Sequence, residues 1–308
     1  MWNKKGLIIN INNFNDWMIS HACVPTAINI DENTIRVYYS PRNKKGQSIP
    51  TFLDVDLDNP SIIKYIHNKP ILNLGELGTF DDGGIMPCSA VRVSESCIYL
   101  YYVGWNPSVS VPYRNSIGLA ISNDNGNTFE RAFRGAIVER NRDEPFFTAS
   151  PFVLKENDKW HLWYASSTGF VIVNEKPEPL YEIKYASSEN GIDWLRQNIT
   201  CIPPSERYQC TARPSVIKEE GIYKMWYTYR GSFDYRDGID SYKIGYAESK
   251  DAINWIRLDS RCGIELSKLG WDSKMQTYPS AIKVKNKKYL FYNGNGFGKS
   301  GIGYAEWE

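Results

Sequence analysis

The sequence has little of what several protein classes require. Its 308 residues contain no run of about 18 apolar residues, so we expect no membrane insertion. Its 36 basic and 35 acidic residues leave a net charge of +1, whereas a nucleic-acid surface needs a basic excess. Only three histidines occur, and no two cysteines form a Cys-x-x-Cys motif. We therefore expect no nucleic-acid partner, no metal site and no cofactor.

Signals for export are also scarce. After Lys4 and Lys5, only Leu7-Ile8-Ile9 is apolar, which is too short for the apolar core of a signal peptide. Six cysteines are present, and an even count permits disulfides. Without an export signal, buried reduced thiols are the better interpretation. We expect a cytoplasmic protein.

Aromatic residues, by contrast, are abundant. They make up 14% of the chain, and 23 glycines and 16 prolines accompany them. Tyrosine and tryptophan favour strands and also line grooves that are partly polar. This composition points to an all-β fold.

A short pattern recurs five times at nearly constant spacing. In each copy a proline precedes a small apolar strand, and successive prolines lie 62 to 65 residues apart. The prolines are Pro25, Pro87, Pro151, Pro214 and Pro279. A second strand with a tyrosine and a third strand follow each proline; four third strands resemble Ile-Gly-Tyr-Ala. In three copies a hairpin turn then leads into a fourth strand.

Four antiparallel strands repeated five times predict a five-bladed β-propeller that occupies residues 1–308 as one domain. The fifth copy ends after its third strand. Residues near 2–10 resemble the missing fourth strand. We predict that they complete the last blade and close the ring, which also removes two exposed sheet edges.

Polar loops precede the inner strands, so their residues should reach one mouth of the central channel. Four acids in these loops are candidate catalytic groups: Asp81, Asp82, Glu144 and Asp272. We expect Asp81 or Asp82 as the acid, with Glu144 or Asp272 as the base or a hydroxyl-binding group. The alternative is that each aspartate belongs to a structural turn. A Ser122-x-Asp124 turn further along the chain fits an Asp-box on the outer rim.

Candidate binding residues come from these loops and from those that join the second and third strands. Aromatic rings stack on the apolar face of a sugar, amides bind its hydroxyls, and arginine binds carboxylate or phosphate. The candidates are His21, Trp105, Asn106, Tyr113, Arg114, Asn115, Arg213, Arg230, Trp271, Tyr278, Asn293 and Asn295. The alternatives are that the arginines pair with nearby carboxylates and that His21 is a core histidine.

The five proline-headed strands, with the loops Gly-Thr-Phe-Asp-Asp-Gly (residues 78–83) and Gly-Trp-Asp (residues 270–272), resemble the five-bladed glycoside hydrolase clans. These include families 43, 32 and 68 and the family 130 mannoside phosphorylases. The chain looks most like uncharacterised cytosolic propellers associated with bacterial surface-sugar genes, which implies a role in polysaccharide biosynthesis. In family 43 three carboxylates flank the inner-strand prolines, but here those positions hold Val24, Met86 and Ala149. Those catalytic roles therefore do not transfer.

Three functions remain open at this stage. Inverting hydrolysis needs two carboxylates about 6.5–9.5 Å apart, and retention needs about 5–5.5 Å. A phosphorylase or sugar transferase needs one acid or base, while arginines hold a phosphate or nucleotide-sugar group. We expect a carbohydrate-active enzyme that uses loop carboxylates on a sugar or sugar phosphate. The alternative is a glycan-binding propeller without catalysis, which the missing family 43 carboxylates favour. The enzyme interpretation fails if the four acids lie on the outer rim instead of the channel mouth.

Overall fold

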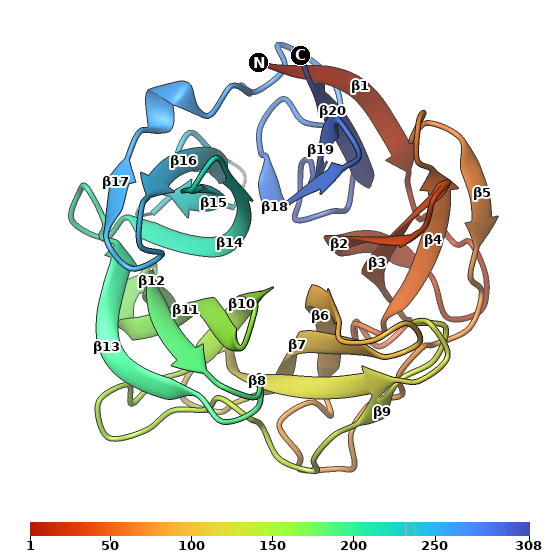
Figure 1. Ribbon diagram of the computed structural model, residues 1–308. Coiled ribbons are helices and arrows are strands. Elements are labelled where there is room, and N and C mark those ends of the chain that lie inside the picture. Colours follow the sequence, from red (N-terminus) through yellow and green to blue (C-terminus); the bar gives the residue numbers. More distant parts are fainter. Residues whose placement is uncertain (232, 237) are drawn as a thin grey trace.

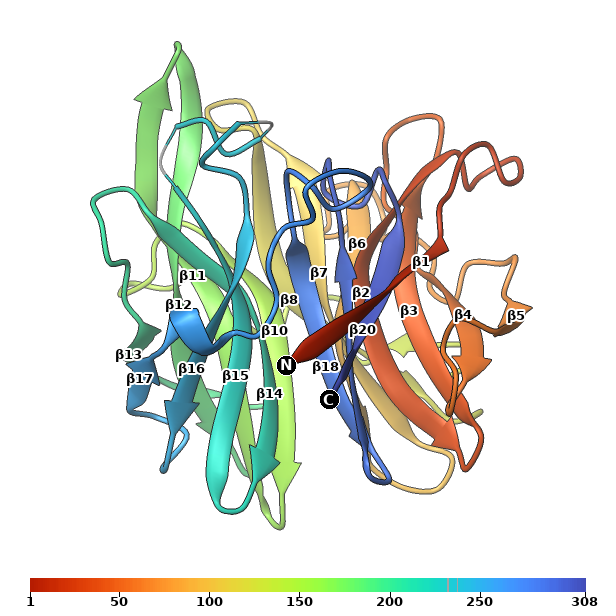
Figure 2. The same ribbon diagram turned by 90° about the horizontal axis from the view of Figure 1, so that it is seen from above.

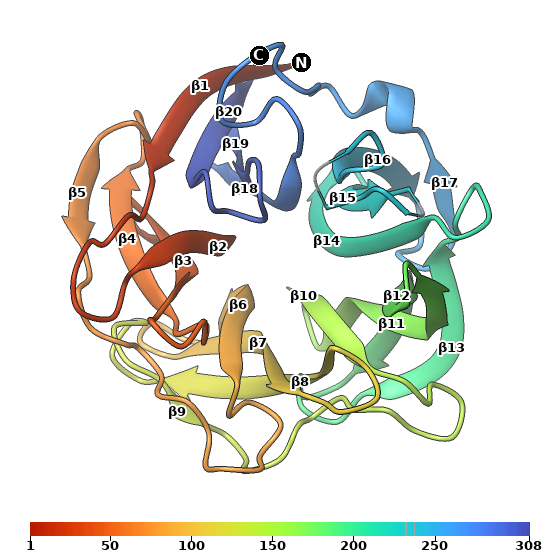
Figure 3. The ribbon, with the colours of Figure 1, turned by 180° about the vertical axis from the view of Figure 1, so that it is seen from behind.

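The computed structural model describes residues 1–231, 233–236 and 238–308. Within this part of the chain, twenty strands form five four-stranded antiparallel sheets around a central axis (Figure 1). The same ring of five blades is visible from behind in Figure 3. The predicted five-bladed β-propeller is confirmed.

In blades one to four the strands follow one another in chain order from the axis outward. Blade one contains β2 (Ser20–Asp31), β3 (Thr34–Arg42), β4 (Thr51–Asp56) and β5 (Ile63–Ile66). Blade two contains β6 (Gly84–Arg92), β7 (Ile98–Pro107), β8 (Tyr113–Ser122) and β9 (Glu130–Arg131). Blade three contains β10 (Thr148–Glu156), β11 (Lys159–Val173), β12 (Lys176–Ser188) and β13 (Leu195–Ile202). Blade four contains β14 (Cys210–Glu219), β15 (Ile222–Arg230), β16 (Lys243–Ser249) and β17 (Trp255–Arg257).

Blade five is built from both ends of the chain. It contains β18 (Thr277–Val284), β19 (Lys287–Asn293), β20 (Ile302–Trp307) and, as its outer strand, β1 (Trp2–Ile9). Strand β1 pairs with β20 from Trp2 opposite Trp307 to Ile9 opposite Ile302, and Figure 1 shows the two strands side by side. The predicted closure by the N-terminal strand is confirmed.

The repeated proline marks a bulge in each inner strand. Proline cannot donate to the ladder, and the register shifts at this point in all five blades. In four blades the residue before the proline has a left-handed backbone, with φ of 58° at Val24, 49° at Ser150, 50° at Arg213 and 55° at Tyr278. Such non-glycine residues cost about 1–3 kcal/mol each and often mark functional sites.

Hydroxyl side chains just after the proline connect neighbouring inner strands. Ser280 Oγ accepts a bond from the backbone N–H of Ala27 at 3.0 Å, which joins blade five to blade one. Ser215 Oγ accepts one from Ala281 at 2.8 Å, which joins blade four to blade five. Equivalent contacts involve Thr26 and Ser89. These bonds explain why a small polar residue follows the proline in most copies.

Hydrophobic cores lie between neighbouring blades, and a further cluster surrounds the axis. Between blades four and five, Trp2 packs edge-on against Trp226 and Trp307 at centroid distances of 5.2 and 5.1 Å. The second strands supply large buried rings to these interfaces, among them Trp163 and Tyr101. Much of the aromatic content therefore builds the ring. Among the described residues, no helix is long and apolar enough to cross a membrane.

The Asp-box turn is a structural element on blade two. Asp124 accepts hydrogen bonds from Ser122 Oγ and from the backbone N–H groups of Asn127 and Thr128. A serine followed two residues later by an asparagine or aspartate makes the same turn in blades three and four. These contacts hold the hairpin that leads into the outer strand, as the sequence predicts.

Candidate active site at one mouth of the channel

A cavity of about 290 Å³ lies at the end of the channel where the inner strands begin. The residue before the proline lines it in four blades: Val24, Met86, Ser150 and Tyr278. The loops that precede and follow these strand ends supply the remaining walls. In these four blades the residue before the proline thus borders a common space.

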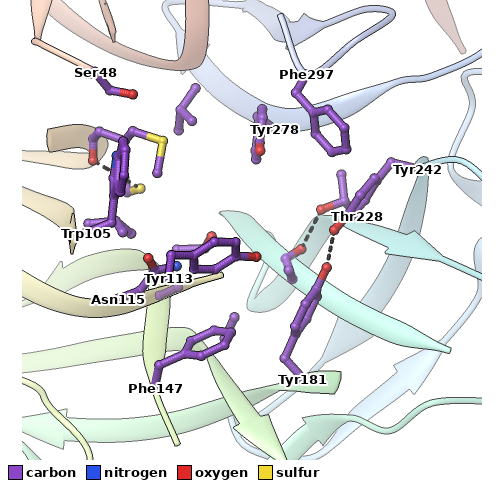
Figure 4. A pocket seen from close by; sticks show the side chains of 18 of the residues that line it. Ser48, Trp105, Tyr113, Asn115, Phe147, Tyr181, Thr228, Tyr242, Tyr278 and Phe297 are labelled. Carbon is purple, nitrogen blue, oxygen red and sulfur yellow. Dashed lines mark hydrogen bonds between the residues drawn. The ribbon is translucent and has the colours of Figure 1, made fainter. Parts of the chain in front are cut away.

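Aromatic side chains make up eight of the 22 residues that line the cavity, and Figure 4 labels seven of them. Of the predicted binding residues, Trp105, Tyr113, Asn115 and Tyr278 line the cavity. Other rings line it that sequence reasoning did not select; those labelled in Figure 4 are Phe147, Tyr181, Tyr242 and Phe297. The hydroxyls of Tyr181 and Tyr242 face each other and are hydrogen-bonded. Burial raises the pKa of both groups, so they are neutral donors at pH 7.

Two long segments bring the missed residues to this mouth. The β11–β12 hairpin extends beyond the other blades and rises above the ring in Figure 2. The hairpin carries Glu178 and Tyr181 on β12, ahead of the Ile-Lys-Tyr-Ala segment (residues 183–186) that matches the repeated third-strand pattern. The loop between β15 and β16 adds Tyr235 and Arg236. Residues 170–173 are Phe-Val-Ile-Val, a run that favours a strand, and this run was the sequence signal for a longer hairpin.

Two arginines give the cavity a positive character. Arg42, at the end of β3, lines the cavity, and no carboxylate in the described part of the chain lies within ion-pair distance of it. Its Nε is buried and has no hydrogen-bond partner among the described residues. Arg236 also lines the cavity and pairs with Glu178 at 2.9 Å. Burial and the nearby Arg42 lower the pKa of the half-buried His21 to about 4, so His21 is neutral at pH 7.

Arg213 lies beneath the cavity instead of in its wall. The residue is 1% exposed, and its guanidinium donates to the carbonyls of Cys88 at 2.5 Å and Pro25 at 2.9 Å and to Thr26 Oγ1 at 3.1 Å. It thus crosses the axis from blade four to blades one and two. A second cavity of about 550 Å³ lies at the opposite mouth, and Cys88 borders both. Arg213 was predicted to bind substrate, but it lies outside the cavity lining and connects the inner strands beneath the cavity.

Three of the four predicted catalytic acids are held in a repeated buried contact. Asp81 (0% exposed) accepts from the Tyr102 hydroxyl at 3.0 Å and pairs with Arg131 at 2.8 Å. The same tyrosine–carboxylate–cation group recurs in three further blades. Its members are Tyr164, Glu144 and Arg196 in blade three, Tyr227, Asp259 and Arg257 in blade four, and Tyr292, Asp272 and Lys4 in blade five.

The structure therefore does not bring these acids to the cavity. None of Asp81, Glu144 and Asp272 lines it, and each carboxylate is engaged by a tyrosine and a cation. Burial alone would raise the pKa of Asp272, but hydrogen bonds from Lys4 and other neighbours lower it below its ordinary value. Asp82 also lies outside the cavity lining; its Oδ2 accepts from the backbone N–H of Gly78. Their placement favours the structural alternative over the catalytic one.

The other predicted binding residues have separate surroundings. Asn106 and Arg114 border a different hollow, of about 330 Å³, beside Phe80. Trp271 stacks on Tyr292 at 5.0 Å, next to the blade-five contact. Asn295 accepts backbone bonds from residues 274 and 275.

Two further candidates are buried behind the cavity. Asn293 is fully buried, accepts from the Val24 N–H and donates to two carbonyls. Arg230 is 1% exposed and donates to the Tyr181 hydroxyl at 2.9 Å. Both residues hold lining groups in place, but neither is itself part of the lining.

No model of a known protein family matches the chain. The chain is 34% identical over 306 residues to an uncharacterized protein found in two strains of Mycobacterium tuberculosis, covering 99% of this chain and 98% of the relative. It is 36% identical over 120 residues to a β-1,2-mannobiose phosphorylase of a Thermoanaerobacter species, covering 36% of this chain and 37% of that protein.

Solved structures share the fold at lower identity. A glycoside hydrolase of Parabacteroides distasonis matches with a TM-score of 0.71 and 17% identity, covering 99% of this chain and 95% of that one. A structure from a study of family 130 mannoside phosphorylases and hydrolases matches with a TM-score of 0.71 and 16% identity, covering 100% and 94%. The chain shares the five-bladed β-propeller fold of these solved structures, and it belongs to the same family as its mycobacterial relative.

Proposed function

We propose that this protein is a carbohydrate-active enzyme that transfers a glycosyl unit to or from phosphate in the cavity at the channel mouth. One observation carries the proposal: the described residues that line the cavity include two arginines and several hydroxyls but no carboxylate. Hydrolysis by two carboxylates needs a facing pair, and nothing in this lining supplies one. Transfer to phosphate needs cations for the anion and a single proton-transfer group.

The walls suit a sugar ring. Trp105, Tyr113 and Tyr278 offer flat apolar faces, and Asn115 offers an amide whose Oδ1 has no partner among the described residues. Such rings stack on a pyranose while amides bind its hydroxyls. Arg42 would then hold the phosphate, because its charge faces no carboxylate in the described structure. We further propose that the protein acts in the cytoplasm on precursors of a surface polysaccharide.

The relative named a β-1,2-mannobiose phosphorylase suggests the first substrates to test. We expect the protein to release mannose 1-phosphate from β-1,2-mannobiose and inorganic phosphate, or from another disaccharide in a panel. Arg42→Met should weaken phosphate use about 10- to 150-fold, because a hydrogen bond to a charged group contributes about 1.5–3 kcal/mol. The measurement is the KM for phosphate by coupled assay, with phosphate binding followed by calorimetry.

A matched control is Arg142→Met, because the Arg142 side chain is 92% exposed and is not among the residues that line the cavity. It should leave the KM for phosphate unchanged. An Arg42→Met protein that uses phosphate as well as the wild type would contradict the role of Arg42.

A second candidate function is glycan binding without turnover. The carboxylate-free lining among the described residues favours it, because the usual catalytic pair is missing. In that case calorimetry would detect oligosaccharide binding, and no product would form with water, phosphate or nucleotide sugars. The two outcomes separate the candidates.

A further inference from the structure

One carboxylate makes direct contact with residues of the cavity wall. Glu178, on β12, has a side chain that is 12% exposed. Its carboxylate accepts a hydrogen bond from the hydroxyl of Tyr235 and two from Arg236, at 2.9 and 3.1 Å. Tyr235 and Arg236 both line the cavity, whereas Glu178 does not. Glu178 therefore lies behind the cavity lining and contacts two of the lining residues.

Two guanidinium groups lie close to the ring of Tyr235. The guanidinium of Arg230 lies 3.8 Å from the ring centroid, and that of Arg236 lies 4.9 Å away. Tyr242 packs edge-on against the same ring at 6.0 Å. Cations over an aromatic face are attracted to it and would also stabilise negative charge that develops on the phenol. Tyr235 is 4% exposed, so its hydroxyl is positioned by these neighbours and by Glu178.

We propose that Tyr235 is the catalytic acid–base of this site and that Glu178 acts through it as the store of the transferred proton. This inference rests on the proposed function, because it supplies the single proton-transfer group that transfer to or from phosphate requires. It also explains how the site can work although no described carboxylate lines the cavity. Glu178 is a positioning residue in this arrangement, and Tyr235 is the group that meets the substrate.

The proton balance is complete in both directions. In synthesis, the acceptor oxygen bonds to the anomeric carbon while the bond from that carbon to phosphate breaks and phosphate leaves with the electron pair. The acceptor hydroxyl gives its proton to Tyr235 Oη, and the Tyr235 proton passes to Glu178. Glu178 then loses this proton to solvent, which balances the proton that the departing phosphate takes up as it becomes hydrogen phosphate. In phosphorolysis, hydrogen phosphate loses its proton to solvent as it attacks the anomeric carbon, and Glu178 takes up a proton from solvent. Tyr235 protonates the leaving glycosidic oxygen, and Glu178 restores the Tyr235 proton.

The hydrogen bonds that Glu178 makes in the structure match the starting state for synthesis. Glu178 accepts from both Tyr235 and Arg236, which is the pattern of an ionised carboxylate. Burial raises the pKa of Tyr235, and the bond to Glu178 raises it further, so the phenol keeps its proton until the acceptor arrives. A protonated phenol beside an ionised carboxylate is the starting state that the synthetic relay needs.

The test uses the full chain with mannose 1-phosphate as donor and mannose as acceptor, or whichever pair the disaccharide panel identifies. Tyr235→Phe should lower kcat about 10²- to 10⁴-fold with KM within a few-fold, since positioned acid–base groups contribute this much. Glu178→Gln should lower kcat and remove the acidic limb of the kcat–pH profile, and Glu178→Asp should restore part of both. A purely structural role for Glu178 would not alter the shape of that profile.

A similar tyrosine–glutamate pair elsewhere provides the control. The Tyr246 hydroxyl donates to Glu248 at 2.8 Å, and neither residue lines the cavity. Tyr246→Phe and Glu248→Gln should therefore leave kcat and its pH profile unchanged. Thermal denaturation of all variants shows which are folded, and Glu178→Asp tests the relay if Tyr235→Phe does not fold.

The outcomes are distinguishable. If the wild type turns over and Tyr235→Phe or Glu178→Gln keeps full kcat with an unchanged pH profile, the relay is overturned and the proposed function stands. If the folded wild type turns over none of the sugar phosphates or disaccharides, both proposals are overturned together.

Discussion

Deleting residues 1–10 is expected to unfold the whole ring and not only its last blade. The deletion removes Trp2, a buried ring whose loss alone costs about 3–5 kcal/mol. It also removes Lys4, which leaves the buried Asp272 without its cation, and breaking such a pair costs about 3–5 kcal/mol. The combined loss approaches the whole stability of a typical protein, about 5–15 kcal/mol. We therefore expect the shortened chain to aggregate or to melt at least about 15 °C lower.

Differential scanning fluorimetry and solubility measure this effect. Leu7→Ser is the matched control, because Leu7 lies on the same strand and is 43% exposed. It should leave the melting temperature nearly unchanged. A synthetic peptide of residues 1–10 should bind the shortened chain and raise its melting temperature. An unaltered melting temperature after deletion would show that β1 contributes little to closure.

Replacing Asp81 with alanine is expected to lower the free energy of unfolding by about 3–5 kcal/mol. The change leaves the fully buried Tyr102 hydroxyl without its acceptor and Arg131 without its carboxylate. The free energy of unfolding falls because buried polar groups lose their hydrogen-bond and ion-pair partners. Urea denaturation measures the effect, and turnover per folded molecule in the disaccharide assay measures any separate catalytic role.

The equivalent tyrosine of blade one supplies a control. Tyr39 occupies the same place on its strand as Tyr102, but its buried hydroxyl has no hydrogen-bond partner among the described residues. Tyr39→Phe should therefore keep or slightly raise stability, whereas Asp81→Ala should lower it. If the Asp81→Ala protein kept full stability and lost turnover, Asp81 would have a catalytic role, and the structural role proposed for it would be wrong.

The repeated tyrosines identify a shared contact of the predicted catalytic acids that the sequence pattern did not reveal. The loops before blades two and five both place an aspartate after an aromatic residue, which suggests a shared site. The shared partner is instead a tyrosine 20 or 21 residues later, Tyr292 for Asp272 and Tyr102 for Asp81. A tyrosine stands at this position in all five second strands, and that recurrence was the available signal. A local pattern does not reveal which way a loop carboxylate points.

The fold, in contrast, was readable because every blade repeats the same local pattern. The five prolines that predicted the repeat each lie in the inner strand of a different blade. Proline interrupts each inner strand at the same point, so the side chain before it leaves the sheet in the same direction. Of the residues before the prolines that line the cavity, only Tyr278 was predicted from the sequence as a binding residue.

By itself, the sequence determined the five repeats, the closure of the last blade by the N-terminal strand and the side of the ring where a cavity lies. These follow from short-range periodicity and from the rule that sheet edges must be covered. Only the tertiary structure decided which groups meet there: Arg42 from blade one, Glu178 from the long hairpin of blade three and Tyr235 from a loop of blade four. Their meeting depends on hairpin length, on loop path and on the angle between blades, which arise when distant segments pack into the closed ring.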